Sequence, residues 1–162
     1  MEIREAEPRD AEAMSRVLIA SITELCDQDH GGEPANIESW TANKAPDTVR
    51  TWIDDPAHHL VVAERAGLVV GVGCYGDDGE VRLNYVAPEA RLSGVSKALL
   101  SHMEQAMRAR GITVARLSST CTARRFYRSA GWVDNGPAEP RFGVACHPMT
   151  KALGAAEGEA NA

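Results

Sequence analysis

The clearest chemical signal in this sequence lies in a loop between an expected strand and an expected helix. The strand covers residues 80–87, the helix covers 94–110, and the connecting loop carries Arg91 and ends at Gly94. Backbone N–H groups in the first turn of a helix have no partner within the helix, and the helix dipole places partial positive charge at that end. The loop therefore predicts a binding site for an anion.

The cysteine pattern predicts neither a metal site nor a disulfide framework. The cysteines stand singly, without Cys-x-x-Cys spacing, at Cys26, Cys74, Cys121 and Cys146. Zinc sites and small secreted domains use closely spaced cysteines. We therefore expect no metal and a reducing, cytoplasmic environment. No histidine accompanies Cys121 in its motif, so we expect a buried thiol without a nucleophilic role.

Composition narrows the class of protein. The chain has 162 residues, 44% hydrophobic and 25% charged, which is typical of a single soluble globular domain. Its formal net charge of −6 argues against a general nucleic-acid surface and mildly favours a cationic partner. The N-terminus is charged, and no apolar run approaches the ~18 residues that span a bilayer. We expect a soluble cytoplasmic protein with no membrane partner.

Hydrophobic periodicity predicts the elements that position the anion-binding loop. Alternating or β-branched runs predict strands at 1–6, 59–64, 68–75, 80–87, 112–119 and 142–149. Apolar residues at helical spacing predict helices at 10–26, 36–42, 46–53, 94–110 and 122–130. The strand, helix and strand between residues 80 and 119 predict a local parallel pairing.

Glycine and proline add expectations about two of these strands. Gly71 and Gly73 alternate within one strand, which predicts a bulge or a close backbone neighbour. Pro140 and Pro148 bracket the last strand, which places it at a sheet edge because proline cannot donate a ladder hydrogen bond.

Two segments read as irregular. Residues 27–34 are polar and contain two glycines, so we expect a loop, with His30 solvated inside it. Residues 152–162 are small, polar and acidic, and we expect a disordered tail there.

Two motifs give the chain a family resemblance. Arg91-Leu92-Ser93-Gly94-Val95-Ser96 resembles the signature of the GCN5-related N-acetyltransferase (GNAT) family: Arg or Gln, two residues, Gly, one residue, then Gly or Ala. It departs from that signature at Ser96. Downstream, the family's spacing of Ala, Tyr, Gly and an aromatic residue is met by Ala123, Tyr127, Gly131 and Trp132. The similarity covers about residues 1–150.

The resemblance implies a fold and a domain organisation. The expected fold is a GNAT-like three-layer α/β (α+β) arrangement, whose central, mixed but mostly antiparallel twisted sheet has six or seven strands and helices on both faces. Residues 1–151 would form a single N-acetyltransferase domain. The central strand would splay from the next one, which leaves a slot for a ligand.

The resemblance also implies acetyl-CoA as the cofactor, with its pyrophosphate as the anion in the loop. The guanidinium of Arg91 and the loop amides suit a diphosphate, and Gly94 lets the backbone approach it. The N–H of Val86 would polarise the thioester carbonyl. Thr120 stands where many relatives carry an asparagine. The implied cofactor-binding residues are Tyr85, Val86, Arg91, Leu92, Ser93, Gly94, Val95, Ser96, Thr120, Ala123 and Phe126.

Catalysis of acetyl transfer needs an acid for the departing thiolate and a route for the amine's proton. By its position in the family motif, Tyr127 is the implied acid. Glu80 lies where some relatives place a carboxylate and is one candidate for the base. A water relay and an acceptor that arrives deprotonated are the alternatives.

The resulting hypothesis is an acetyl-CoA-dependent N-acetyltransferase that moves the acetyl group directly to a primary amine of a small molecule or an exposed amino group. A non-catalytic acyl-CoA-binding domain with a regulatory role and a protein N-terminal acetyltransferase are the alternatives. Glu24, Asp27 and Asp29, on the expected acceptor side, favour a cationic acceptor. Homodimers are common in the family.

Overall fold

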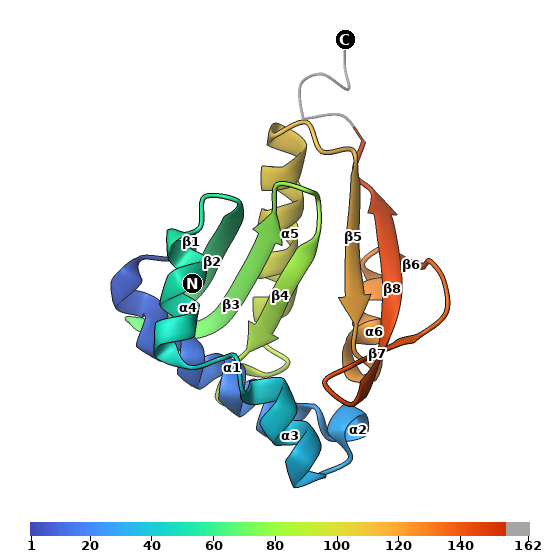
Figure 1. Cartoon of the computed structure of the whole chain (residues 1–162). Coiled ribbons are helices and arrows are strands. Elements are labelled where there is room, and N and C mark those ends of the chain that lie inside the picture. Colours follow the sequence, from blue (N-terminus) through green and yellow to red (C-terminus); the bar gives the residue numbers. More distant parts are fainter. Residues whose placement is uncertain (155–162) are drawn as a thin grey trace.

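A computed structural model describes residues 1–154 and shows eight strands arranged in two four-stranded sheets (Figure 1). The first sheet has the order β1 (Glu2–Glu5), β2 (His58–Arg65), β3 (Leu68–Gly76) and β4 (Val81–Val86), and all its pairs are antiparallel. The second contains β5 (Val114–Ser119), β8 (Val144–Ala152) and β6 (Val133–Asp134), with β7 (Glu139–Arg141) paired to β8.

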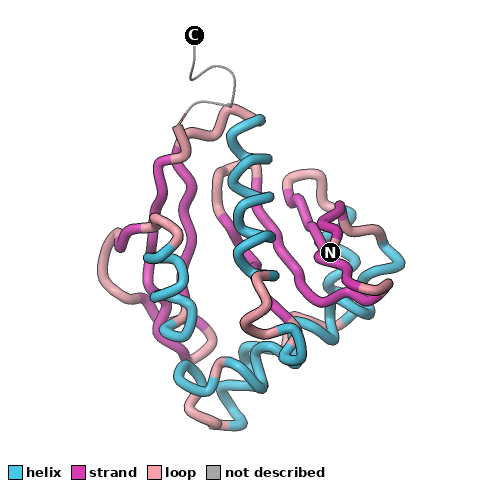
Figure 2. Tube along the Cα trace, turned by 180° about the vertical axis from the view of Figure 1, so that it is seen from behind, coloured by secondary structure: helices cyan, strands magenta, loops and turns pink. Residues whose placement is uncertain are grey.

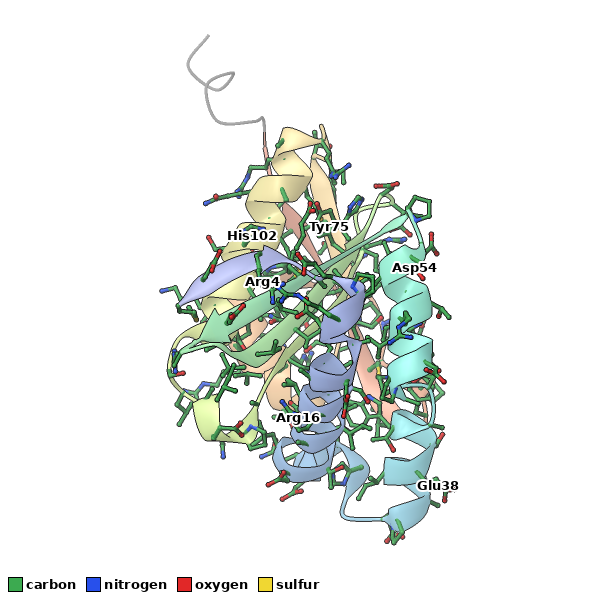
Figure 3. The ribbon with its side chains drawn as sticks, turned by 90° about the vertical axis from the view of Figure 1, so that its left-hand side faces the viewer. Arg4, Arg16, Glu38, Asp54, Tyr75 and His102 are labelled. Carbon is green, nitrogen blue, oxygen red and sulfur yellow. The ribbon has the colours of Figure 1, made fainter. Side chains whose placement is uncertain are left out.

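Helices cover both faces of these sheets and give three layers. The helices are α1 (Ala11–Leu25), α2 (Asp27–His30), α3 (Pro34–Thr41), α4 (Pro46–Asp54), α5 (Val95–Ala109) and α6 (Cys121–Ser129). Seen from behind, α5 and α6 lie over the strands on the same face (Figure 2). In side view, His102 of α5 lies on one side of the first sheet and Asp54 of α4 on the other (Figure 3). The expected GNAT-like fold class is therefore confirmed.

The two sheets touch along β4 and β5 at one end only. The expected parallel pairing of these strands is limited to one isolated bridge between Glu80 and Arg116, with a hydrogen bond of 2.9 Å from the N–H of Arg116 to the carbonyl of Gly79. Beyond that point β4 and β5 diverge, as Figure 1 shows. The single sheet expected from the resemblance is thus divided in two, and the separation provides the expected slot.

Helix α5 packs tightly on β3 because β3 has glycines where the helix crosses it. A Cβ built on Gly71 would lie 2.7 Å from Cγ1 of Val95, and one built on Gly73 would lie 3.0 Å from Sδ of Met103. The two glycines therefore make room for helix side chains. The expectation of a bulge or a close backbone neighbour is met in part: the register of β3 against β2 shifts directly beside Gly71, since Gly71 pairs with Ala63 but Val69 with Glu64. The atoms nearest to both glycines belong to side chains and not to backbone.

A second, smaller core joins the two halves of the molecule where the sheets diverge. It is made of buried side chains from α1, α3 and β8, with Tyr85 of β4 packed against it: Ile22, Cys26, Trp40, Val144 and Cys146. The main core lies between the first sheet, α1 and α5 and extends to Trp132 and Met149. The second cluster fixes the distance between the sheets at the open end of the slot.

The last strand differs from the sequence prediction in its bounds and in its place in the sheet. β8 covers Val144–Ala152 rather than 142–149, and it is an interior strand, with β5 on one side and β6 and β7 on the other. The short segments β6 and β7 cover the side that the prolines were expected to leave open, and the carbonyl of Pro148 accepts a hydrogen bond of 2.8 Å from the N–H of Asn135. Leu153 is buried, so the ordered domain continues past residue 151. Residues 155–162 of the expected tail lie outside the described residues.

The segment 27–34 is also more ordered than expected. Residues 27–30 form α2, and α3 begins at Pro34 rather than at residue 36. His30 is only 1% exposed, its Nε2 lies 2.9 Å from the carbonyl oxygen of Ile22, and its Nδ1 accepts from the N–H of Gly32. The expectation of a solvated histidine is therefore wrong.

Among the residues described, none of the helices combines the length and the apolar character needed to cross a membrane.

Candidate active site

A cleft of about 510 Å³ opens between β4 and β5, where the two sheets separate. Its walls come from α1 (Ser21, Leu25, Cys26), β4 (81–86), the segment 90–97 except Ser93, β5 and its end (117–120), and α6 (Thr122, Ala123, Phe126, Tyr127). The structure thus brings the expected acid and every expected cofactor residue except Ser93 to one cavity. Ser93 lies in the same loop, where its hydroxyl donates to the carbonyl of Ala90 over 2.5 Å.

The loop before α5 presents a row of free backbone donors at one end of the cleft. Among the described residues, none accepts a hydrogen bond from the backbone N–H groups of residues 92–97. Gly94 precedes α5 with φ of +86°, and Leu92, with φ of +60°, is 93% exposed. Left-handed backbone is strained for a side chain such as leucine. Free amides, a helix N-terminus and the side chains of Arg91 and Lys97 are groups suited to an anion, and they lie where the sequence predicts an anion site.

The edge of β4 that faces the cleft carries unpaired backbone groups. β4 is the outermost strand of its sheet, and the N–H of Ala87 bonds to the carbonyl of Val70 on β3. Because the N–H groups of an antiparallel strand alternate between its two edges, the N–H of Val86 points away from β3, toward the cleft. A ligand lying along this edge can therefore pair with the backbone of β4, as an added strand would.

Tyr127 reaches the cleft from α6. The hydroxyl of Thr120 caps this helix by accepting from the N–H of Ala123 at 3.2 Å, so the Thr120 side chain is engaged in its own helix. Tyr127 is 6% exposed and makes edge-to-face contacts with Phe126 and Trp132, at 5.2 and 5.9 Å between ring centroids. Burial raises the pKa of Tyr127 to about 12, and the contact with the Asn84 side chain opposes this rise. The phenol therefore stays protonated at neutral pH.

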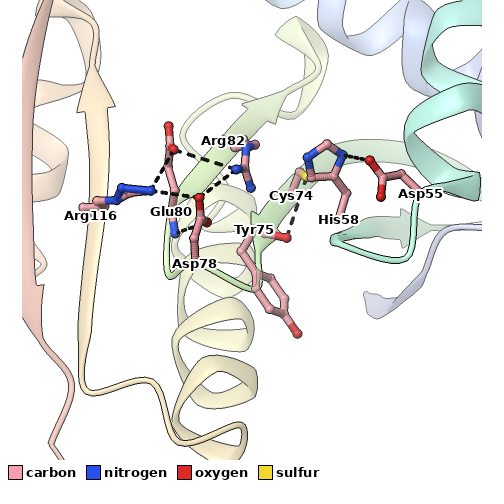
Figure 4. A network of polar contacts seen from close by, with 8 residues as sticks. All are labelled: Asp55, His58, Cys74, Tyr75, Asp78, Glu80, Arg82 and Arg116. Carbon is pink, nitrogen blue, oxygen red and sulfur yellow. Dashed lines mark hydrogen bonds and ion pairs between the residues drawn. The ribbon is translucent and has the colours of Figure 1, made fainter.

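Glu80 lies outside the cleft lining. Its carboxylate is 3.4 Å from the guanidinium of Arg116 and 3.9 Å from that of Arg82, and Arg116 is also 2.8 Å from Asp78 (Figure 4). This network ties the β3–β4 turn to β5 at the joined end of the sheets. The structure thus does not bring Glu80 together with Tyr127, and the described lining holds no acidic or histidine side chain.

Beside the cleft, Asp29 caps helix α6 from another part of the chain. Its carboxylate accepts from the N–H of Cys121 at 2.6 Å, from the N–H of Thr122 at 3.4 Å and from the hydroxyl of Thr122. A carboxylate at a helix N-terminus is favoured by the helix dipole. Asp29 is therefore engaged within the protein, which weakens the expectation that it attracts a cationic acceptor.

Cys121 is exposed and lies 3.1 Å from Nε2 of His147. The expectation of a buried thiol is therefore wrong, and although no histidine stands in the motif of Cys121, the fold brings His147 beside it. Burial of the sulfur and the neighbouring Asp29 raise the pKa of this thiol, so it is not an activated thiolate. Sequence reasoning missed the contact because His147 is 26 residues away.

A second cavity, of about 440 Å³, lies near the other end of α5 and shares no described residue with the cleft. It includes Tyr75 and His102, which Figure 3 labels. Here Nε2 of His59 is 2.6 Å from Asp77, and the guanidinium of Arg110 donates to the hydroxyl of Tyr75 at 3.2 Å.

Fold and cleft together define an α/β protein with an open cleft between two separated sheets and a row of free backbone amides at one end of it. Residues 14–153 match the family model described as an acetyltransferase (GNAT) domain. The chain therefore belongs to the GNAT acetyltransferase family. The family resemblance predicted from the two sequence motifs is confirmed.

Individual relatives agree with this assignment. The chain is 34% identical to an IAA acetyltransferase from Azospirillum brasilense over 93 residues, which are 52% of this chain and 61% of that protein. The fold is similar to a GNAT protein from Rhodopseudomonas palustris, with a TM-score of 0.84, 22% identity and coverage of 93% and 94% of the two chains. It is also similar to the PaiA N-acetyltransferase of Thermoplasma acidophilum, solved with coenzyme A, with a TM-score of 0.79, 20% identity and coverage of 93% and 98%.

Proposed function

We propose that this protein is an N-acetyltransferase that moves the acetyl group of acetyl-CoA directly to a primary amine. One observation carries the proposal: the free amides before α5, the cleft-facing N–H of Val86 and the buried phenol of Tyr127 lie in one cleft. These groups suit the phosphates, the thioester carbonyl and the thioester sulfur of the same molecule. The acyl donor supplies an activated acetyl group. The protein orients this donor and gives it hydrogen bonds at the phosphates, the thioester oxygen and the sulfur.

The protein's own groups divide the work along the cleft. The amides of residues 92–97 and the guanidinium of Arg91 bind the pyrophosphate. The free edge of β4 pairs with the amide arm of the donor. The N–H of Val86 stabilises the negative charge that develops on the thioester oxygen when the amine attacks.

Tyr127 donates a hydrogen bond to the sulfur as the bond between carbon and sulfur breaks. Its pKa of about 12 exceeds that of an ordinary thiol by about 3.5 units, so full proton transfer from the phenol to a thiolate is uphill by about 5 kcal/mol. Tyr127 is therefore a hydrogen-bond donor that lowers the energy of the departing sulfur. The amine nitrogen gains the acetyl group and loses one proton, and the sulfur keeps the electron pair and finally becomes a thiol.

The proton of the amine leaves without a carboxylate or imidazole in the described lining. A free amine attacks and its ammonium form does not, so the acceptor enters deprotonated or loses its proton to water. The rate should then rise with pH toward the pKa of the acceptor. Ser21 and Leu25 of α1 and Cys26, which follows it, also line the cleft and offer an uncharged surface to the acceptor.

The test is thiol release from acetyl-CoA with a panel of primary amines that includes polyamines, aromatic amines and peptides with a free N-terminus. Product coenzyme A is measured by chromatography, because a thiol reagent would also react with the exposed Cys121. Tyr127→Phe should lower kcat at least tenfold while the Kd for coenzyme A stays within twofold.

The matched control is Tyr75→Phe, which removes a hydroxyl from the second cavity and should leave turnover unchanged. Tight binding of acetyl-CoA with no thiol release across the panel would instead support the acyl-CoA-binding alternative. Preference for peptide N-termini over small amines would support the protein N-terminal acetyltransferase alternative.

A further inference from the structure

The charged side chains that line the cleft are all cationic. They are Arg82, Arg91 and Lys97, and no described residue of the lining is acidic. Arg91 and Lys97 stand at the two ends of the segment that carries the free amides, where the phosphates of the acyl donor would neutralise them. Arg82 is paired outside the lining, with Asp78 at 2.9 Å and Glu80 at 3.9 Å (Figure 4). The described part of the cleft therefore offers no carboxylate to an ammonium group.

The acidic residues expected on the acceptor side leave this balance of charge unchanged. Glu24, Asp27 and Asp29 all lie outside the cleft lining. Glu24 is exposed, and the side chain of Asp27 is 79% exposed. The two carboxylate oxygens of Asp29 accept hydrogen bonds from the N–H of Cys121 and the hydroxyl of Thr122. A cationic group inside the cleft would thus find none of these carboxylates in the wall around it.

The wall at the end of α1 is uncharged and favours neutral groups. It consists of Ser21, Leu25 and Cys26, and Tyr85 of β4 also lines the cleft. Burial, together with the neighbouring carboxylates of α2, raises the pKa of the Cys26 thiol to about 12, and burial also raises the pKa of the Tyr85 phenol. Both side chains are therefore neutral at neutral pH. The same withdrawal from water disfavours any unpaired charge placed beside them.

We propose that the acceptor is a monoamine with an uncharged, mostly apolar body, and that the cleft discriminates against short polyamines. This inference rests on the proposed function of the same cleft. The reacting nitrogen attacks without its extra proton, so it needs no carboxylate. A second amino group remains an ammonium at neutral pH and would exchange water for a lining without a described carboxylate. A methyl group at the same place carries no such cost, because its burial is favourable.

Two acceptors of equal size test this preference. Pentylamine and putrescine differ only at the far end of the chain, which is a methyl group in the first and an ammonium group in the second. We expect kcat/KM for pentylamine to exceed that for putrescine about thirtyfold, a factor that corresponds to about 2 kcal/mol for the unpaired charge. Equal values or a preference for putrescine would overturn the proposal, while release of coenzyme A with either amine would still support the proposed function.

Leu25 allows the charge of the wall to be changed directly. Leu25→Glu introduces a carboxylate into the lining and should reduce the preference for pentylamine to about threefold or less, mainly by raising kcat/KM for putrescine. Leu25→Gln is the matched control, since its side chain has nearly the same size and no charge, and it should keep most of the preference. If both variants changed the preference to the same extent, the argument from charge would be contradicted.

Binding of the acetylated products separates this inference from catalysis. Each product carries a neutral amide in place of the reacting amine, so its binding needs neither deprotonation nor turnover. With coenzyme A bound to the protein, calorimetry should give a Kd for N-pentylacetamide about thirtyfold below that for N-acetylputrescine. Equal or reversed affinities, or no binding of N-pentylacetamide, would overturn the proposal whatever the protein catalyses.

The expected order of affinities in a protein that releases no coenzyme A with any amine would have a different meaning. It would support the preference for an uncharged body and place the failure in the proposed transfer of the acetyl group. The kinetic and the binding measurements together therefore distinguish the two claims.

Discussion

Substituting Gly71 by alanine should weaken coenzyme A binding although Gly71 does not itself line the cleft. Its added Cβ would lie 2.7 Å from Cγ1 of Val95 and 2.8 Å from Cδ1 of Leu99, where 3.4 Å is ordinary contact. The first turn of α5 must therefore shift by about 0.7 Å. Val95 and Leu99 are 1% and 0% exposed, so neither has room to turn aside. Overpacking of this size costs about 1–3 kcal/mol.

The shift should reach the ligand because Val95 is the first residue of α5 and adjoins the free amides. We expect a loss of about 1–3 kcal/mol in the free energy of unfolding, measured with urea, and a roughly tenfold rise in the Kd for coenzyme A, measured by calorimetry. Gly73→Ala is the matched control. Its Cβ would meet the flexible end of Met103 at 3.0 Å, two turns further along α5, and Cγ2 of Val61 on β2 at 3.0 Å, so it presses on α5 only through a side chain that can bend.

Gly73→Ala should therefore lose less stability and keep the wild-type Kd within twofold. The reasoning fails if Gly71→Ala binds coenzyme A as tightly as Gly73→Ala does while both are destabilised. That result would show that α5 moves as a rigid unit or that the anion site tolerates the shift.

Three other predictions concern residues that sequence reasoning either did not single out or assigned the wrong environment. Asp29→Ala should cost about 1–2 kcal/mol of unfolding free energy and lower kcat, because α6 loses its cap, and Asp29→Asn, which retains an acceptor oxygen, should recover part of both losses. Burial lowers the pKa of the Lys44 amine from 10.5 to about 8, so between these pH values the unfolded chain binds a proton that the folded chain does not. The unfolding free energy should rise across this window by up to about 3 kcal/mol relative to Lys44→Met, and parallel pH profiles of the two proteins would refute this. Of the cysteines, only Cys121 is exposed, so a thiol reagent should modify one equivalent in the native protein and none in Cys121→Ser, and modification of further thiols without unfolding would contradict the structure.

The helices and the first sheet could be predicted largely from sequence because their signals are local. The helix expected at 94–110 is observed at Val95–Ala109, and the hairpin expected from 59–64 and 68–75 is observed as β2 and β3. The position of β8 could not be predicted in the same way. Pro148 would indicate an edge strand only if no other strand paired with that side of β8. The strands that do so, β6 and β7, come from segments too short to show strand periodicity.

The residues of the candidate site likewise divide into those that a local motif predicts and those whose surroundings depend on the tertiary structure. Arg91, Gly94 and Tyr127 stand in motifs with characteristic spacing, and the structure brings them to one cleft. Glu80 directly precedes β4, and its carboxylate pairs with Arg116 from the other sheet.

By itself, the sequence determined the anion-binding loop, because its amides, its left-handed glycine and the start of α5 are consecutive residues. The tertiary structure alone decided which side chains surround that loop. Asp29 reaches the start of α6 across 92 residues, and Cys121 meets His147 across 26. Such contacts leave no local pattern, since they depend on how two diverging sheets and the second core bring distant segments together. The loop predicts the kind of group that would bind, and the folded cleft decides which side chains surround that loop.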